Sequence, residues 1–208
     1  MSGLSFCFVG DRAFFLDQTR DRYFCLGVRR SNELATGLAT ADSGADFWEA
    51  RFSDILSHAP AGELPVQFEP LPIIGDANVA GAVGRNSLRL AAAYLSARRS
   101  LARNGLMPTL QTLRRSIASS RLRMASESEL RDVAAAVAWL GRWTALSERC
   151  LPLSLAAARY MISRGLRTAL VLGVKSGPFA AHAWIQSEGI VVSCPAEEAS
   201  LYRPILVI

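Results

Sequence analysis

Histidine and cysteine are scarce in this chain of 208 residues, which has two histidines and four cysteines. The cysteines are widely scattered, form no Cys-x-x-Cys pair, and are Cys7, Cys25, Cys150 and Cys194. Structural zinc sites need four such ligands at short, regular spacings. We therefore predict no metal site and no cofactor. Free thiols in a reducing cytoplasm are the simplest account of these cysteines.

Long apolar runs are also missing. No stretch of about 18 uncharged apolar residues occurs, which excludes a membrane-spanning helix. The N-terminus, residues 1–6, lacks the basic region and apolar run of a secretion signal. These absences predict a cytoplasmic protein that does not insert into membranes.

Lysine is nearly absent, since Lys175 stands alone against 22 arginines. The net charge is +5 and the pI is about 9.4. A positive surface favours an acidic peptide, a nucleic acid or an anionic membrane as partner. Half of the residues are apolar and a fifth are charged, which predicts a packed core in one large domain or two small ones.

The first 60 residues have the pattern of strands followed by helices. Aromatic and β-branched residues interrupted by polar turns predict a three-stranded antiparallel meander over residues 5–9, 13–17 and 22–27. Two helical patterns follow, the first beginning at Ser31 and the second at Asp46, each with a plausible polar cap. Three small strands followed by helices resemble a compact winged-helix module.

The middle of the chain changes from a proline- and glycine-rich stretch to long helices. Residues 61–86 have the composition of a linker. Helical periodicity then covers residues 88–103, 109–119 and a stretch that begins at the capping sequence 126–129 and runs towards Trp143. The last 60 residues predict a helix over 151–164 and strands over 168–174, 181–187 and 190–192. The fold class is therefore α+β.

Cys150 and His182 are the pair that most narrows the chemistry. Cys150 stands at a predicted helix start, where free N–H groups and the helix dipole favour a thiolate and can line an oxyanion hole. His182 lies in a predicted strand and could take the thiol proton as a general base. Each residue alone is more typical of core packing, but together they indicate a hydrolase or an acyl transferase. His58 precedes Pro60 and is predicted to be a surface residue.

The residues around this pair carry a family resemblance. Residues 148–151, 170–174, 178–179 and 182–185 resemble the transglutaminase-like cysteine peptidase of lasso-peptide maturation, the B protein. The N-terminal meander, with residues 15–17 and 22–26, is similar to the leader-recognition module fused to that peptidase. The resemblance implies a leader-recognition domain over 1–60, a linker over 61–86 and a papain- or transglutaminase-like peptidase domain over 87–208.

The resemblance also implies a function, a partner set and roles for residues. The protein would bind the leader of a ribosomally made precursor peptide and cleave it from the core, with Cys150 as nucleophile and His182 as base. An ATP-dependent cyclase resembling asparagine synthetase would then close the macrolactam ring. The strand residues expected to bind the leader by edge addition are Arg22, Tyr23, Phe24, Cys25 and Leu26. Tyr23 and Phe24 face opposite sides of a strand, so only one of them can contact the peptide.

One position departs from the family pattern. An aspartate follows the histidine by about a dozen residues in the family, whereas here Cys194 takes that place. A neutral thiol supports an imidazolium poorly. Glu197 or Glu198 could reach back around the turn, or a backbone carbonyl, Ser193 or Gln186 could hold the ring. The remaining alternative is a slow or inactive enzyme.

Two other functions stay open at this point. The first is a leader-binding chaperone with a degenerate peptidase half. The second is a basic winged-helix protein that binds nucleic acid. The second helix argues against it, because this helix carries Asp46, Glu49 and Asp54 against the single basic residue Arg51. We therefore expect no nucleic-acid partner, and we expect the Arg-rich stretch over residues 98–123 to form a solvated helix face.

Overall fold

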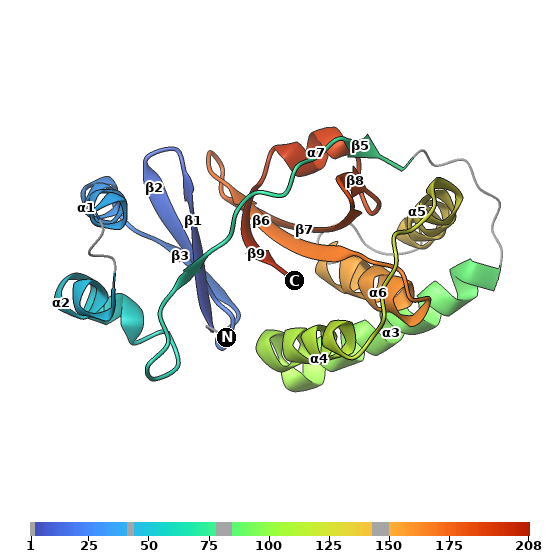
Figure 1. Cartoon of the computed structure of the whole chain (residues 1–208), viewed down its shortest axis with the longest axis horizontal. Coiled ribbons are helices and arrows are strands. Elements are labelled where there is room, and N and C mark those ends of the chain that lie inside the picture. The colour runs from blue at the N-terminus through green and yellow to red at the C-terminus, as the bar shows by residue number, and fades with distance from the viewer. Residues whose placement is uncertain (1–2, 41–43, 78–84, 143–149) are drawn as a thin grey trace.

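The computed structural model describes residues 3–40, 44–77, 85–142 and 150–208 (Figure 1). Within these ranges the chain forms two β-sheets, each covered by helices, and the predicted α+β class is confirmed. None of the helices in these ranges combines the length and the apolarity that a membrane crossing requires.

The N-terminal sheet is the predicted meander. The strands β1 (Leu4–Val9), β2 (Arg12–Asp17) and β3 (Arg22–Cys25) pair antiparallel in sequence order. A short strand, β4 (Val66–Gln67), adds to β1 in parallel and completes the sheet order β3-β2-β1-β4. The strand predicted to bind a peptide, β3, therefore lies at an edge of the sheet.

Two helices, α1 (Val28–Ala39) and α2 (Ala45–Leu56), cover one face of this sheet (Figure 1). Both begin earlier than predicted, at glycine N-caps without a side-chain cap, so the proposed caps at Ser31 and Asp46 are wrong. Ser31 is instead buried. Its Oγ accepts the backbone N–H of Ala13 at 3.0 Å and thereby holds α1 on the sheet.

The segment predicted as a linker is partly strand. It supplies β4 to the N-terminal sheet and β5 (Gly75–Asp76) to the C-terminal sheet, where β5 pairs in parallel with β8. Both are two-residue edge strands, which a proline-rich segment can form because few of its N–H groups are needed. The segment thus ties the two sheets together.

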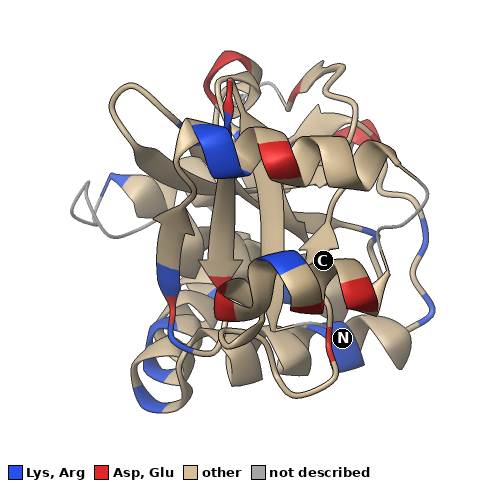
Figure 2. Cartoon of the chain, turned by 90° about the vertical axis from the view of Figure 1, so that its left-hand side faces the viewer, with Lys and Arg blue, Asp and Glu red and all other residues tan. Residues whose placement is uncertain are grey.

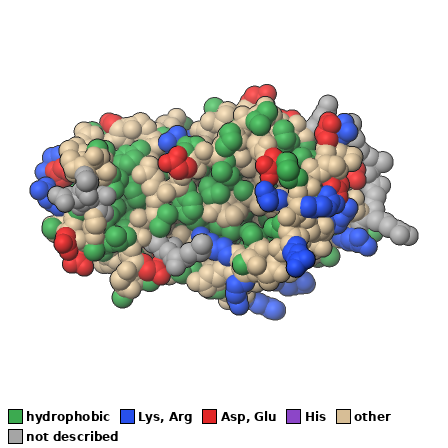
Figure 3. All heavy atoms as spheres, viewed as in Figure 1, with side chains coloured by type: hydrophobic (Ala, Val, Ile, Leu, Met, Phe, Trp, Pro, Cys, Tyr) green, Lys and Arg blue, Asp and Glu red, His purple; other side chains and the backbone are tan. Residues whose placement is uncertain are grey.

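Three long helices follow: α3 (Arg85–Asn104), α4 (Leu106–Ala118) and α5 (Glu127–Gly141). They pack against α6 (Cys150–Ser163), the helix that lies on the C-terminal sheet. The predicted capping box at the start of α5 is confirmed. Ser126 Oγ accepts the N–H of Glu129 at 3.3 Å, and the Glu129 carboxylate accepts the N–H of Ser126 at 3.0 Å. The arginines of the 98–123 stretch are exposed except for the half-buried Arg114, and Figure 3 shows basic side chains gathered at this helical end.

The C-terminal sheet has the order β5-β8-β7-β6-β9. Its remaining elements are, in chain order, α6 (Cys150–Ser163), β6 (Ala169–Lys175), β7 (Ala180–Ser187), β8 (Ile190–Val191), α7 (Ala196–Ser200) and β9 (Arg203–Val207). The sequence pattern missed α7 and β9. The helix α7 is too short to show a period, and Pro204 argues against a strand except at a sheet edge, where β9 lies.

The two sheets meet through the second face of the meander. Cys7, Phe14 and Leu16 belong to the same core as α6 and the C-terminal sheet. The thiol of Cys7 donates to the carbonyl of Arg203 at 3.9 Å, and the ring of Phe14 stacks on Phe179 with centroids 5.8 Å apart. The meander is therefore buried on both faces, between α1 and α2 on one side and the C-terminal half on the other.

Candidate active site

Cys150 is the first described residue of α6 and is half-buried against the main core. Ser154, about one turn further along α6, is buried, and its Oγ donates a hydrogen bond to the carbonyl of Ala183 on β7 at 2.9 Å. This bond fastens the first turns of α6 to the strand that carries His182. The first turn of a helix presents unpaired backbone N–H groups, which can donate to an oxyanion that forms beside the thiol.

His182 lies on β7, paired with Gly173 on β6. Its side chain is 14% exposed, and its ring lies 5.1 Å from that of Tyr202 and 6.0 Å from that of Trp184, centroid to centroid. Burial lowers the pKa of the imidazole, and Lys175 lowers it further against the opposing effect of Glu198. The ring is therefore held neutral, which is the form that accepts a proton.

The imidazole does not contact the thiol of Cys150 in this structure. Ala183 and Ile185 of β7 face the core beneath α6, whereas Trp184 faces a separate cluster beside α7. Because side chains alternate along a strand, His182 shares the α7 side with Trp184. Figure 1 shows α6 and α7 on opposite sides of β6 and β7. The buried Nε2 atom of His182 has no hydrogen-bond partner among the described residues.

Cys194, which the family resemblance predicts at the aspartate position, lies in the segment between β8 and α7. A ring nitrogen of His182, the Cys194 thiol and a Glu198 carboxylate oxygen all lie within 4.8 Å of one another. Burial raises the pKa of the Cys194 thiol to about 12, with smaller contributions from the negative charges of Glu198, Asp76 and Cys150. Cys194 is therefore a neutral thiol and gives the imidazole no charge support.

Glu198 is the carboxylate that reaches the histidine. Its Oε1 atom lies 4.0 Å from His182 Nε2, and its side chain is 47% exposed on α7. Glu197 is also exposed, and no described contact joins its carboxylate to His182. The other two side chains that the sequence suggested for orienting His182 make hydrogen bonds elsewhere. Ser193 accepts the N–H of Ile185 at 2.9 Å, and Gln186 accepts the indole N–H of Trp184 at 2.9 Å.

Close packing around the imidazole depends on a glycine opposite it. A Cβ atom at Gly173 would lie 2.8 Å from the Trp184 ring and 2.9 Å from Tyr202 Cβ. Lys175, two residues further along β6, sits 4.8 Å above the Tyr202 ring as a cation. The prediction from sequence did not include Tyr202 or Lys175. Lys175 could have been noticed as the single lysine of the chain.

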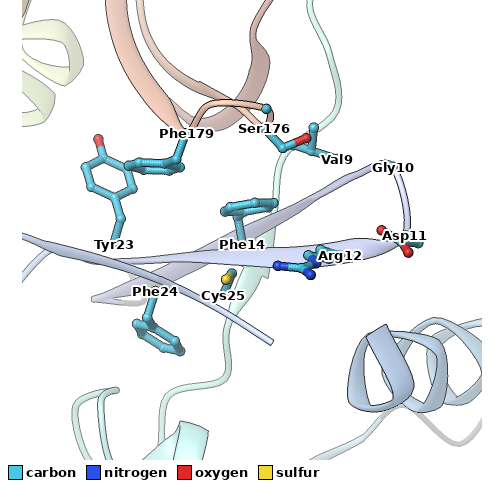
Figure 4. A pocket seen from close by; sticks show the side chains of 11 residues that line it. Val9, Gly10, Asp11, Arg12, Phe14, Tyr23, Phe24, Cys25, Ser176 and Phe179 are labelled. Atoms are coloured by element: carbon cyan, nitrogen blue, oxygen red, sulfur yellow. The ribbon is translucent and has the colours of Figure 1, made fainter. Parts of the chain in front are cut away.

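The five residues predicted to bind a leader lie in or beside the edge strand β3. Arg22 and Cys25 are exposed, Tyr23 and Phe24 are half-buried, and Leu26 is buried beneath α1. The side chain of Leu26 is therefore not accessible to a peptide, because it belongs to the core of the N-terminal half. Tyr23 and Phe24 face opposite sides of the sheet, as predicted from the strand period (Figure 4).

A cavity of about 420 Å³ opens between β3 and the turn that joins β6 to β7. Tyr23, Phe14 and Phe179 form its aromatic side, as Figure 4 shows, and Phe24 points away towards His58. Burial raises the pKa of the Tyr23 hydroxyl, and the negative charges of Asp21 and Cys150 raise it further. Tyr23 thus lines the cavity and lies within electrostatic range of Cys150.

A cysteine on a helix followed by a histidine on a strand is also the arrangement that the comparison with protein families supports. The transglutaminase-like superfamily core matches residues 91–207, more than half of the chain. The chain belongs to the transglutaminase-like superfamily. Comparisons with curated proteins and with solved structures returned no match. The transglutaminase-like domain thus contains α6, β7 and the Cys194 turn, and it supports hydrolase or transferase chemistry at a Cys–His pair.

Proposed function

We propose that this protein is a leader peptidase of lasso-peptide biosynthesis. The observation that carries the proposal is Cys150 at the start of α6 in a transglutaminase-like domain, on a helix bonded directly to the strand of His182. The N-terminal meander with its open edge strand supplies a place for the leader. The precursor peptide is the substrate, and the product passes to an ATP-dependent cyclase of the asparagine-synthetase type.

In the proposed reaction, His182 takes the thiol proton of Cys150, and the thiolate attacks the carbonyl carbon at the leader–core junction. The tetrahedral intermediate collapses as His182 returns the proton to the leaving amine, which leaves an acyl-enzyme. Water then gives a proton to His182 and attacks the thioester carbonyl, and the thiol is restored. Glu198 stabilises the imidazolium in place of the family aspartate.

The imidazole must come to the thiol for this reaction to proceed. Catalytic hydrogen bonds are often long in peptide-free enzymes and tighten in the substrate complex. We propose that peptide binding in the cavity beside Tyr23 and Phe179 brings His182 to Cys150 around the start of β7. Phe179 belongs to the turn that leads directly into this strand, so a peptide in the cavity contacts the segment that has to move.

Leader recognition rests on β3 in this proposal. An extended leader adds to the free edge of β3 through main-chain hydrogen bonds, and its side chains enter the cavity lined by Tyr23, Phe14 and Phe179. Arg22 and Cys25, which are exposed, flank this path. The peptide would then run from the N-terminal sheet towards Cys150.

The test is cleavage of the precursor encoded next to this protein, followed by mass spectrometry. Wild type should release the leader, and Cys150→Ala should release none while binding a labelled leader with unchanged affinity. Cleavage that persists in Cys150→Ala and disappears in Cys194→Ala would instead identify Cys194, whose sulfur lies within 4.8 Å of a His182 ring nitrogen, as the nucleophile. An uncut precursor with wild type would contradict the proposal.

A second candidate function is leader binding without catalysis. It is favoured by the separation of Cys150 and His182 on the two sides of β7 and by the neutral thiol at position 194. It predicts nanomolar to micromolar leader affinity with no cleavage, and cleavage that appears in Cys194→Asp.

Nucleic-acid binding has weaker support. Figure 2 shows acidic and basic residues side by side on the helices that cover the N-terminal sheet. Arg30 of α1 is bound at 2.7 Å by both carboxylate oxygens of Asp54 on α2, so its charge is neutralised locally. These helices therefore present a mixed surface rather than a basic one.

A further inference from the structure

His182, Cys194 and Glu198 form a cluster of three different ligand atoms. They come from β7, from the turn after β8 and from α7, and they converge to within 4.8 Å of one another. Among the described residues, no other group of at least three histidine, cysteine or acidic side chains gathers this closely. A nitrogen, a sulfur and a carboxylate oxygen are the ligand types that zinc prefers.

One ring nitrogen of the histidine in this cluster makes no hydrogen bond, whether it carries a lone pair or a proton. Its Nε2 atom is buried and makes no hydrogen bond to the described residues. Leaving such a group unpaired costs about 1–3 kcal/mol, and native structures rarely keep one without an unseen partner or a functional role. The rings of Trp184 and Tyr202 lie 6.0 and 5.1 Å from the imidazole, centroid to centroid, and Nε2 lies 4.0 Å from Glu198 Oε1.

The separations suit a metal after small side-chain movements. Bonds of about 2.0–2.3 Å in a tetrahedron place ligand atoms roughly 3.5 Å apart, and Nε2 is 4.0 Å from Glu198 Oε1. Glu198 is half-exposed on α7 and free to close this gap. Asp76 fixes the start of α7 by accepting the N–H of Ala196 at 2.9 Å, which keeps the turn of Cys194 in place.

We propose that His182, Cys194 and Glu198 bind one zinc ion with a fourth position open to solvent. On binding, the Cys194 thiol releases its proton to solvent and forms the metal–sulfur bond, while neutral His182 donates its lone pair. The thiolate and the Glu198 carboxylate balance the two charges of the ion. Lys175 is the nearby cation and opposes binding, and its position over the Tyr202 ring keeps it outside the cluster.

The metal site makes the proposed peptidase switchable. This consequence rests on the proposed function. Bound zinc occupies the imidazole that would otherwise act as base for Cys150. The metal-bound protein therefore does not cleave, and a chelator activates it. An aspartate at position 194 would orient the imidazole, whereas the cysteine found here adds a metal ligand. The departure from the family pattern thereby becomes a regulatory feature.

The test uses the full-length, reduced protein and Co²⁺ as a spectroscopic probe, with no peptide present. Wild type should bind one Co²⁺ with a near-ultraviolet sulfur charge-transfer band and the strong visible bands of four-coordinate cobalt, and Zn²⁺ should displace it. Cys194→Ser should lose the sulfur band, His182→Ala should lose binding, and Glu198→Gln should weaken it about tenfold or more. Circular dichroism melting checks that each variant is folded.

Cys150→Ala and Cys25→Ser are the matched controls, because they remove the other two cysteines that solvent reaches. Both should keep the wild-type spectrum and stoichiometry. No cobalt binding by wild type, or the full sulfur band in Cys194→Ser, would overturn the proposal. So would a band lost in Cys150→Ala. Since no cleavage is measured, a failed peptidase assay leaves this result unaffected, and an absent metal leaves the peptidase proposal standing.

Discussion

Two histidines, one in each half of the molecule, have contrasting surroundings. His58 Nδ1 lies 3.2 Å from a carboxylate oxygen of Asp17, which is completely buried. His182 has a buried nitrogen without a hydrogen bond and lies 4.0 Å from the half-exposed carboxylate of Glu198. The close histidine–carboxylate pair that a catalytic site is expected to contain is thus found in the N-terminal half, where it stabilises structure.

The difference shows why a pairing of residue types does not identify a site. Asp17 also accepts hydrogen bonds from the backbone and side chains of Thr19 and Arg20, so all its capacity is used in closing the turn after β2. His58 completes this network and packs on Phe24. The buried Nε2 atom of His182, by contrast, makes no hydrogen bond to the described residues and lies 4.0 Å from the Glu198 carboxylate. This nitrogen is therefore available to a reacting group or a ligand.

The largest expected effect is a loss of cleavage activity when His182, but not His58, is replaced. His182→Ala should lower the rate of leader cleavage by about 10²–10⁴-fold, because a general base contributes that much. His58→Gln should change the rate by no more than about threefold under conditions where it is folded. Single-turnover cleavage of the precursor measures both. Equal losses in the two variants would remove the distinction drawn between them.

The next largest effect concerns the stability of the N-terminal network. Asp17→Asn should lower the free energy of unfolding by about 1.5–3 kcal/mol, since it weakens charged hydrogen bonds to a buried group. Urea titration followed by tryptophan fluorescence measures the change. Thr40→Ala, at the exposed end of α1, is the control and should shift the transition little.

The same network should respond to acid. Burial acts to raise the pKa of Asp17, but hydrogen bonds from Thr19, Arg20 and His58 outweigh it and lower the pKa to about 2. The unfolded chain has a higher pKa, about 3.9, so it binds more protons between these values. The stability from Asp17 is therefore present above about pH 4 and lost as the pH falls towards 2. Asp17→Asn should show a smaller loss over this window, and an identical acid profile would contradict it.

Packing around His182 gives an effect of similar or smaller size. Gly173→Ala should lower stability by about 1–3 kcal/mol, because the added methyl collides with Trp184 and Tyr202. Gly75→Ala is the matched control in the same sheet, since a Cβ there meets no atom within 4 Å. Thermal melting compares the two. If Gly173→Ala melts no lower than Gly75→Ala, the enclosure of His182 is looser than described.

The smallest effect is a gain. Cys194→Asp should raise the rate of cleavage about tenfold, equivalent to about 1.4 kcal/mol, because a carboxylate gives the imidazolium the support that a neutral thiol cannot. It should also remove the sulfur band of bound Co²⁺. Cleavage kinetics at saturating precursor provide the measurement, and a rate below that of wild type would show that position 194 does not orient His182.

Local patterns predicted much of the fold. The meander, the α5 capping box and the stop of α6 at Gly165, which has φ of 70°, depend on neighbours in the chain and were found as expected. The caps at Ser31 and Asp46 were wrong, because Ser31 is used by tertiary packing against Ala13. The strands β4 and β5 were missed, because two-residue strands exist only through their partners.

The sequence by itself determined the α+β order of elements, the thiol at a helix start and the histidine on a following strand. These are properties of spacing and residue type. Only the tertiary structure decided that His182 lies on the α7 side of its strand and that Glu198, rather than Glu197, approaches it. The physical reason is that α7 and its turn pack across the sheet and set which side chains meet, over distances that no local pattern encodes.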